Sequence, residues 1–213
     1  YIGSILNGGG AWPKGNKHAS IADWTALAQN YYAASMSTDM AVQIPVIWGT
    51  DAVHGHNNVY GATQFPHNIG LGAANDPALI GEIAKATAKQ VRATGITWIF
   101  APTLAVVQSP RWGRTYEGYG SDPALIRAYG KAFVTGMQGE LKGPHTAVAT
   151  AKHYIGDGGT WLGKDQGEAR ASEAQLIATH APGYFGALEG GVQTVMISYS
   201  SYADPAAGVR HGK

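Results

Sequence analysis

The 213-residue sequence predicts an α/β fold in which buried parallel strands alternate with covering helices. Three observations support this fold. Five short apolar runs alternate with four longer helical patterns. Most of the runs are continuous rather than alternating, as in strands that are buried on both faces. Long Gly-rich loops follow several of the runs. A β-α-β-α series of this kind is typical of a parallel sheet covered by helices.

The predicted strands are short, as is usual for the buried centre of such a sheet. Each apolar run is followed by a loop or a helical pattern. They cover residues 3–6, 44–48, 96–100, 147–151 and 194–198.

Each predicted helix begins at a residue type that caps helices. Ser20 begins the first helix, and Asp76 and Asp122, each followed by Pro, begin the second and third. Ser172 begins the fourth and has a Gln three residues later, which is the pattern of a capping box. Pro182 is expected to kink or interrupt this last helix.

The loops favour a barrel over an open sheet. Residues 49–72, 101–121 and 152–171 follow predicted strands, and in a (β/α)8 TIM-barrel-type domain such loops carry the active site. No Gly-rich turn joins a strand directly to a helix, as a doubly wound sheet would require. A complete barrel needs eight β/α units and about 250 residues. We therefore interpret residues 1–213 as a partial (β/α) barrel domain that is incomplete in this chain.

The composition excludes several classes of protein. Charged residues make up 14% of the chain and the net charge is +1, without a Lys/Arg stripe, so we expect no nucleic-acid partner. No apolar run approaches the ~18 residues of a membrane span, so we expect no membrane partner. The first residues do not have the pattern of a signal peptide. Hydrophobic residues at 45% exclude a disordered chain, and the absence of Cys excludes a disulfide scaffold.

Polar side chains follow the predicted strands. Asp51 follows the second strand, Arg114 lies in the loop after the third, and Lys152 and His153 come directly after the fourth. Tyr199 follows the fifth. Carboxylates and cations at one barrel mouth can hold hydroxyl groups by charge-assisted hydrogen bonds. High aromatic and low charge content favours a sugar over a phosphate as the ligand.

Other interpretations of these residues remain open at this point. Asp51 alone fits a turn cap, and Arg114 could join a surface network with Glu117 and Asp122. Lys152 after a buried strand calls for a partner or a function, and one such function is a Schiff base, as in an aldolase.

Two further patterns have both a functional and a structural interpretation. His54 and His56 form an HxH pair that could bind a metal, but no well-spaced ligand set accompanies it, so we expect no metal and a structural role for His67. Residues 156–159 could cradle an anion, although a tight loop is the favoured interpretation.

Five sequence blocks together resemble family 3 glycoside hydrolases of the β-glucosidase and exo-β-glucanase type. They are IPVIWGTDAVHGHNNVYGATQFPHNIGLGA, WIFAPTLAVV, PRWGRTYEGY, VATAKHYIGDGGT and VMISYSSY. The blocks span almost the whole chain in family order and at family spacing. The resemblance implies the N-terminal barrel domain of that family, with the second domain absent from this chain. It also implies the residues that hold the glycosyl unit: Asp51, Arg114, Glu117, Lys152, His153, Met196 and Tyr199.

The same resemblance implies a retaining, exo-acting hydrolase that removes terminal non-reducing β-D-glucosyl residues from β-glucosides or β-glucans. The partners would be a β-glucoside or β-glucan oligosaccharide, glucose and the remainder of the parent polypeptide, with no cofactor and no metal. The nucleophilic Asp and the acid/base Glu are expected beyond Lys213, so the chain would contain no catalytic carboxylate and would be inactive alone. Family members often act outside the cytoplasm, which implies a periplasmic or secreted location.

Three alternatives to this function stay open. One is a catalytically inactive barrel that only binds sugars. Another is a β-N-acetylglucosaminidase, although the loop KHYIGDGG lacks the His that this branch would need. The last is the Schiff-base aldolase that would use Lys152.

Overall fold

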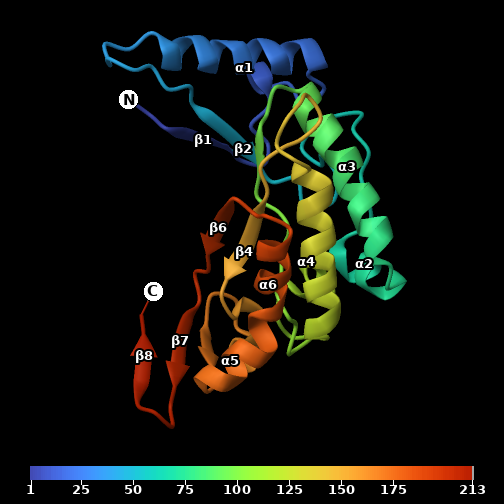
Figure 1. The fold of residues 1–213 in the computed structure, drawn as a ribbon, viewed down its shortest axis with the longest axis vertical. Helices are drawn as coiled ribbons and strands as arrows, with labels where there is room; N and C mark the ends of the chain where they lie inside the picture. The colour runs from blue at the N-terminus through green and yellow to red at the C-terminus, as the bar shows by residue number, and fades with distance from the viewer. Residues whose placement is uncertain (213) are drawn as a thin grey trace.

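Five parallel strands lie side by side in chain order in the computed structural model, which describes residues 1–212. Strand β1 pairs with β2 and β2 with β3, and β4 pairs with β6. A parallel bridge between Trp98 and Val148 joins β3 to the segment that leads into β4, with Ile99 N donating to Val148 O over 2.9 Å. This order is that of a (β/α) barrel, and Figure 1 shows β1 beside β2 and β4 beside β6. The strands are β1 (Ser4–Asn7), β2 (Ile47–Thr50), β3 (Trp98–Ile99), β4 (Thr150–Tyr154) and β6 (Thr194–Ile197).

Helices cover one side of these strands, which confirms the predicted fold class (Figure 1). All four predicted helix starts are confirmed. The side chains of Ser20, Asp76, Asp122 and Ser172 each accept a hydrogen bond from a backbone N–H of the first turn. Pro182 stands at the first position of a separate helix, so it interrupts the fourth predicted helix as expected. The helices are α1 (Ile21–Met36), α2 (Asn68–Ala74), α3 (Pro77–Ala93), α4 (Pro123–Gln138), α5 (Glu173–His180) and α6 (Pro182–Glu189).

Two predicted strand boundaries are wrong. The second strand begins at Ile47 rather than Ile44, because Pro45 has no N–H to donate to a ladder and Ile44 is 65% exposed. The fourth strand runs from Thr150 to Tyr154 rather than from 147 to 151. Lys152 and His153 therefore lie within β4, not in the loop that follows it.

A second, smaller sheet, which the sequence did not predict, lies beyond the C-terminal end of β6. Its strands are β5 (Glu168–Arg170), β7 (Ser201–Asp204) and β8 (Val209–His211), in the order β5-β7-β8. β5 and β7 are parallel, whereas β7 and β8 form an antiparallel hairpin. This sheet is separate from the row of barrel strands, so within residues 1–212 that row has five strands.

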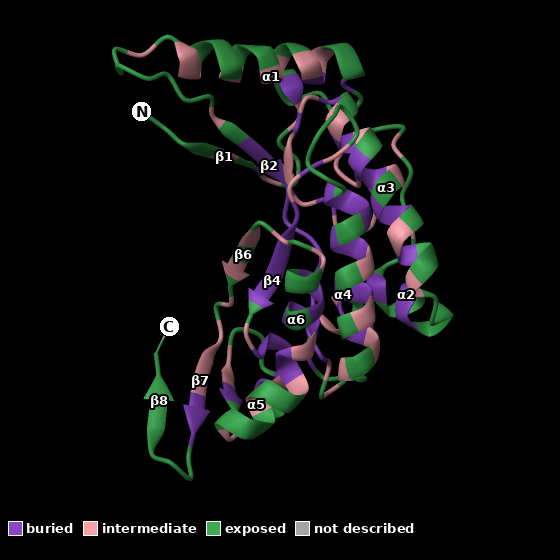
Figure 2. Cartoon of the chain, in the orientation of Figure 1, coloured by how far each residue is buried: buried purple, intermediate pink, exposed green. Residues whose placement is uncertain are grey.

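The helix layer depends on close backbone contacts at glycines. A Cβ on Gly136 of α4 would lie 2.3 Å from the carbonyl oxygen of Gly81 in α3. A Cβ on Gly186 of α6 would lie 2.0 Å from the carbonyl oxygen of Arg127 in α4. The buried residues accordingly form one layer between strands and helices (Figure 2).

Both outer strands of the row expose apolar side chains. Leu6 of β1 is 61% exposed, and Ile197 of β6 is 77% exposed. Figure 2 shows exposed positions on β1 and partly exposed ones on β6, in contrast to β4, which is mostly buried. None of the described helices is long and apolar enough to cross a membrane.

Candidate active site

The candidate site lies at the carboxyl ends of β2 and β4 and in the loops that follow β2 and β3. Asp51 is the first residue after β2, and Lys152 and His153 lie in β4. Arg114 and Glu117 flank and end the 3-10 turn Thr115–Glu117 in the loop after β3. Because parallel strands direct their carboxyl ends to one edge, residues from distant parts of the sequence converge there.

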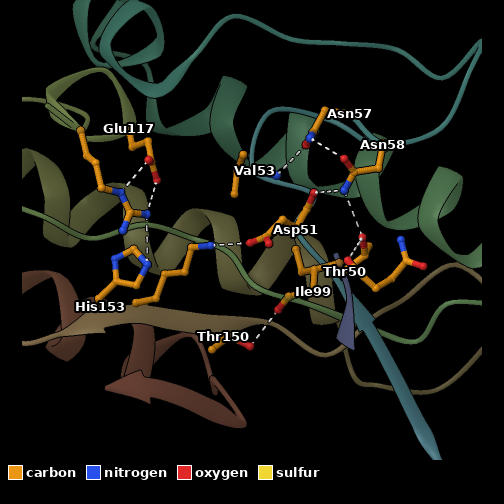
Figure 3. Close-up of polar contacts among 12 residues, drawn as sticks. Thr50, Asp51, Val53, Asn57, Asn58, Ile99, Glu117, Thr150 and His153 are labelled. Atoms are coloured by element: carbon orange, nitrogen blue, oxygen red, sulfur yellow. Dashed lines mark hydrogen bonds and ion pairs between the residues drawn. The ribbon is translucent and has the colours of Figure 1, made fainter. Parts of the chain in front are cut away.

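Lys152 and Asp51 form an ion pair, with 2.8 Å between Nζ and Oδ1. The Lys152 side chain is 4% exposed, whereas that of Asp51 is 44% exposed. Asn58 holds the end of β2, since its Nδ2 donates to the Asp51 carbonyl over 3.1 Å and to Thr50 Oγ1 over 3.2 Å (Figure 3). The ion pair thus combines a buried cation with a carboxylate that reaches solvent, on a fixed backbone. The turn-cap interpretation of Asp51 is wrong, because its carboxylate binds Lys152.

Arg114, Glu117 and His153 form a second group beside the first (Figure 3). Arg114 donates to both carboxylate oxygens of Glu117, through Nε and Nη2, each over 2.7 Å. Arg114 Nη2 also lies 3.2 Å from His153 Nε2. This is a bidentate, partly buried pair rather than the surface network with Asp122, whose carboxylate instead caps α4.

Electrostatics keep the Arg114–Glu117 pair charged. Burial alone would raise the pKa of Glu117, but its hydrogen bonds to Arg114 and the nearby Lys152 outweigh burial and lower that pKa. The hydrogen bond to Glu117 raises the pKa of Arg114 despite burial. Glu117 is therefore held as a carboxylate and does not serve as a proton donor near neutral pH.

Asp157 is a member of the site that the sequence-based residue set omits. Its Oδ2 lies 2.9 Å from His153 Nδ1, and its Oδ1 accepts from Gly158 N over 3.1 Å. With Nδ1 donating to Asp157, Nε2 of a neutral His153 accepts from Arg114. The spacing of His and Asp, four residues apart at the end of a strand, was the available signal.

The remaining two predicted residues differ from this group. Met196 of β6 pairs in register with Lys152 and is partly buried, so it lies beside the ion pair. Tyr199 is 72% exposed and makes no side-chain hydrogen bond to the described residues. The structure thus brings together five predicted residues, places Met196 next to them and leaves Tyr199 at the surface.

The histidines after β2 have structural contacts. His54 Nδ1 lies 2.9 Å from the carbonyl oxygen of Phe65, and its ring stacks on His67 with 4.0 Å between centroids. His56 is fully buried, with Nε2 3.0 Å from Thr94 Oγ1. Burial lowers the pKa of His56 to about 4. Among residues 1–212, no three His, Cys, Asp or Glu side chains are grouped as a metal site would require.

The glycine-rich turn Asp157–Gly159 is a tight packing element. A Cβ on Gly158 would lie 2.5 Å from the carbonyl oxygen of Val106, and Gly159 N donates to Gly156 O over 3.0 Å. The N–H groups of Gly158 and Gly159 are therefore bound within the turn. This confirms the tight-loop interpretation rather than the anion cradle.

The charges of the site nearly balance, which indicates the kind of ligand that it fits. The site has three carboxylates, which belong to Asp51, Glu117 and Asp157. Each pairs with one basic group: the Lys152 ammonium, the Arg114 guanidinium or the His153 imidazole. Lys152 has two donors left after its bond to Asp51, and Asp51 Oδ2 has no partner among the described residues. Spare donors beside spare acceptors fit neutral hydroxyl groups better than an anion. The fold and site together define a (β/α) barrel domain with paired charges at its mouth.

Comparisons with known proteins identify the family. Residues 1–211 match the N-terminal domain of glycosyl hydrolase family 3, and the chain belongs to this family. The chain is similar to a lysosomal β-glucosidase of Dictyostelium discoideum, with 37% identity over 93% of the chain and 25% of the relative. It is also similar to a periplasmic β-glucosidase of Salmonella typhimurium, with 29% identity over 75% of the chain and 20% of the relative.

The chain is also similar to a solved structure. The exo-1,3/1,4-β-glucanase from a Pseudoalteromonas species is 53% identical, with a TM-score of 0.90 over 94% of this chain and 26% of that one. The chain spans about a quarter of the length of these relatives. Family membership confirms the resemblance found in the sequence.

Proposed function

We propose that this chain provides the sugar-holding part of the barrel in a retaining, exo-acting β-glycosidase. The observation that carries the proposal is the convergence of Lys152–Asp51 and Arg114–Glu117, with His153, at one barrel mouth. The substrate is a β-glucoside or a β-glucan, and the product is glucose. The similarity to an exo-1,3/1,4-β-glucanase supports a glucan among the substrates of this family.

In the proposed reaction these residues hold the terminal glucosyl unit. Lys152 donates to a hydroxyl while Asp51 accepts from one. Arg114 donates to a neighbouring hydroxyl through Nη1, which has no partner among the described residues, and His153 orients Arg114. The buried location of Lys152 strengthens its hydrogen bonds to the sugar as charge develops at the reacting carbon. Retaining hydrolysis also requires a nucleophilic carboxylate and an acid/base carboxylate. Asp51 and Glu117 are both committed to cation pairs, so we assign these two reacting groups to further chain and not to residues 1–212.

The exposed outer strands of the row also have an explanation in an incomplete barrel. Leu6 on β1 and Ile197 on β6 lie on the outer strands of the row, where a complete barrel would have further strands. We propose that residues 1–213 form part of the barrel domain, that additional chain completes it, and that a second domain follows. The isolated chain would then bind sugars without turnover.

Activity of the full-length protein tests this function. Glucose release from an aryl β-glucoside and from laminari- or cello-oligosaccharides, with the β-anomer formed first, is the expected result. Absence of glucose release from all of them would refute the β-glucosidase. Glucose binding without hydrolysis would instead support the inactive sugar-binding barrel, and release from an aryl N-acetyl-β-glucosaminide would support that branch.

The contacts of Lys152 argue against the Schiff-base alternative. A Schiff base forms from a neutral amine, whereas Lys152 is in an ion pair with Asp51. Borohydride with a carbonyl substrate is therefore expected to trap no adduct. A periplasmic or secreted location is proposed from the name of the Salmonella typhimurium relative, and cell fractionation would test it.

A further inference from the structure

A second cleft, of about 430 Å³, lies between the loop that follows β4 and the turn that joins β7 to β8. Its lining includes Trp161, Arg170, Gln175 and Asp204. We call it the Trp161 cleft. It shares no residue with the glycosyl site described above. It is nevertheless close to that site along the chain, because the same loop carries Asp157, which holds His153.

Trp161 presents an exposed aromatic surface that contributes little to the core. Its side chain is 53% exposed, and the guanidinium carbon of Arg170 lies 4.9 Å from the ring centroid. The ring is nevertheless held in place. An antiparallel bridge pairs Thr160 with Ala169, and Gly163 N donates to Thr160 O over 2.9 Å. The exposed part of the indole ring is therefore available to a ligand that enters the cleft.

Arg170 is oriented by a carboxylate outside the cleft. Its Nε donates to Glu168 Oε2 over 2.6 Å, and Arg210 Nε lies 2.8 Å from Glu168 Oε1. The Glu168 side chain is only 14% exposed, so it fixes the plane of the Arg170 guanidinium. The two terminal nitrogens of Arg170 donate to no group among the described residues, which leaves them available to a ligand.

Two more side chains that line the cleft, Gln175 and Asp204, have polar atoms without a hydrogen-bond partner among the described residues. Gln175 Oε1 accepts from Ser172 N over 2.9 Å, which leaves the Nε2 amide group free. Asp204 Oδ1 accepts from Ala206 N over 3.1 Å and from Ala207 N over 3.2 Å, which leaves Oδ2 free. The cleft therefore combines one flat apolar face with separate donors and an acceptor.

This combination selects the chemical class of the ligand. A phosphate or other anion would need unbalanced positive charge, but the carboxylates of Glu168 and Asp204 balance the guanidinium groups of Arg170 and Arg210. A purely apolar ligand would leave the guanidinium and amide groups without partners. A sugar ring has a C–H face for the indole and hydroxyls for Arg170, Gln175 and Asp204. The volume is within the ~300–1,000 Å³ that is usual for small-ligand sites.

We propose that the Trp161 cleft binds a glucosyl unit of the β-glucan substrate on the leaving-group side of the cleaved bond. This inference rests on the proposed function for the identity of the sugar. It predicts that the cleft contributes to the use of long oligosaccharides but not of an aryl glucoside, which has no distal glucosyl unit.

The test uses the full-length protein and the variant Trp161→Ala. Kinetics on an aryl β-glucoside and on laminarihexaose are compared, and calorimetry measures the binding of laminarihexaose. We expect Trp161→Ala to raise the KM for laminarihexaose and to weaken its binding about tenfold, with kcat/KM on the aryl glucoside unchanged. Arg170→Ala should act in the same direction. Tyr32→Ala, which removes an exposed aromatic from α1, is the matched control. It should leave the kinetics on both substrates and the binding of laminarihexaose unchanged.

Two results would overturn the proposal. An equal loss on both substrates in Trp161→Ala and Arg170→Ala would show a structural role. An unchanged affinity of both variants for laminarihexaose would show that the cleft binds no glucan. If the wild-type protein hydrolyses neither substrate, the proposed function fails, and calorimetry on wild type and variants still decides whether the cleft binds the oligosaccharide.

Discussion

The ammonium group of Lys152 lies 2.8 Å from the carboxylate of Asp51, although 101 residues separate them in the chain. The two partners differ in exposure, since the Lys152 side chain is 4% exposed and that of Asp51 is 44% exposed. Removing Asp51 should therefore change the free energy of unfolding by a different amount from removing Lys152. Without Asp51 a buried cation loses its counter-ion, whereas without Lys152 the remaining carboxylate is still hydrated.

Substitutions of Asp51 and Lys152 should differ in their effect on stability but have a similar effect on activity. Asp51→Asn should lower the free energy of unfolding by about 1–3 kcal/mol, because Lys152 then stays buried and unpaired. Lys152→Met keeps a side chain of similar length and should leave stability within about 1 kcal/mol. Both should reduce kcat/KM on an aryl β-glucoside at least about 100-fold, because each removes a charge-assisted bond to the sugar. Denaturant unfolding and steady-state kinetics on the full-length variants check this. Equal stability losses would contradict the asymmetry.

Asp157 should act as a positioning residue through His153. Asp157→Asn removes the charge that orients His153 Nδ1, so His153 Nε2 no longer faces Arg114 reliably. We expect kcat/KM to fall about tenfold, which corresponds to the loss of one hydrogen bond of about 1.4 kcal/mol. Asp165→Asn is the matched control on the same loop, where the carboxylate accepts from Trp112 Nε1 over 3.0 Å and should have little influence on kcat/KM. A similar loss in both variants would mean that loop integrity, not His153, is affected.

The packing of α3 on α4 should depend on one of two facing glycines. A Cβ on Gly136 would lie 2.3 Å from the Gly81 carbonyl oxygen, whereas a Cβ on Gly81 meets its nearest atom, the Ala132 carbonyl oxygen, at 3.6 Å. Gly136→Ala should therefore destabilise the domain by about 1–3 kcal/mol through overpacking. Gly81→Ala should be neutral or stabilise the helix by up to about 1 kcal/mol. Thermal unfolding of the two variants gives the comparison, and a loss in Gly81→Ala alone would show that the packing is described wrongly.

Buried His56 should make this domain sensitive to mild acid. Burial lowers the pKa of His56 to about 4 from an ordinary value of 6.5. The unfolded chain therefore binds a proton at a higher pH than the folded one, so stability is complete above pH 6.5 and falls as the pH drops toward 4. The loss from this group reaches about 3 kcal/mol at most.

A variant isolates the contribution of His56. His56→Gln should show a smaller decrease in the free energy of unfolding between about pH 7 and about pH 5 than the wild type. His67 and His180, whose pKa values burial also lowers, remain in both proteins and cancel in the difference. Parallel pH profiles of wild type and variant would show that His56 is not the source of the acid sensitivity.

Local sequence signals predicted the starts of α1, α3, α4 and α5 correctly, whereas α2 lies in a stretch that was predicted as a loop. Caps at Asp76 and Asp122 act within one turn, so residue type and spacing suffice to place the helix starts. Continuous apolar runs marked the five barrel strands, as expected for a parallel sheet, although β1 and β6 each expose one face within residues 1–212. The position of Asp51 just after β2 placed it at the barrel mouth.

Features that depend on distant partners could not be predicted in this way. β5, β7 and β8 are three or four residues long and exist because they pair with one another, not because of their own composition. The bounds of β4 were predicted wrongly because Lys152 and His153 are polar, and only the tertiary structure shows that Asp51 and Asp157 pair with them inside the fold.

The sequence by itself determined the class of fold, the starts of the helices and the family to which the chain belongs, because these follow from periodicity, caps and motif blocks along the chain. Only the tertiary structure decided which charges meet: Lys152 with Asp51, Arg114 with Glu117, and His153 with Asp157. The physical reason is that ion pairs depend on distance in space. The barrel order brings loops after β2, β3 and β4 to one mouth, whatever their separation in the chain.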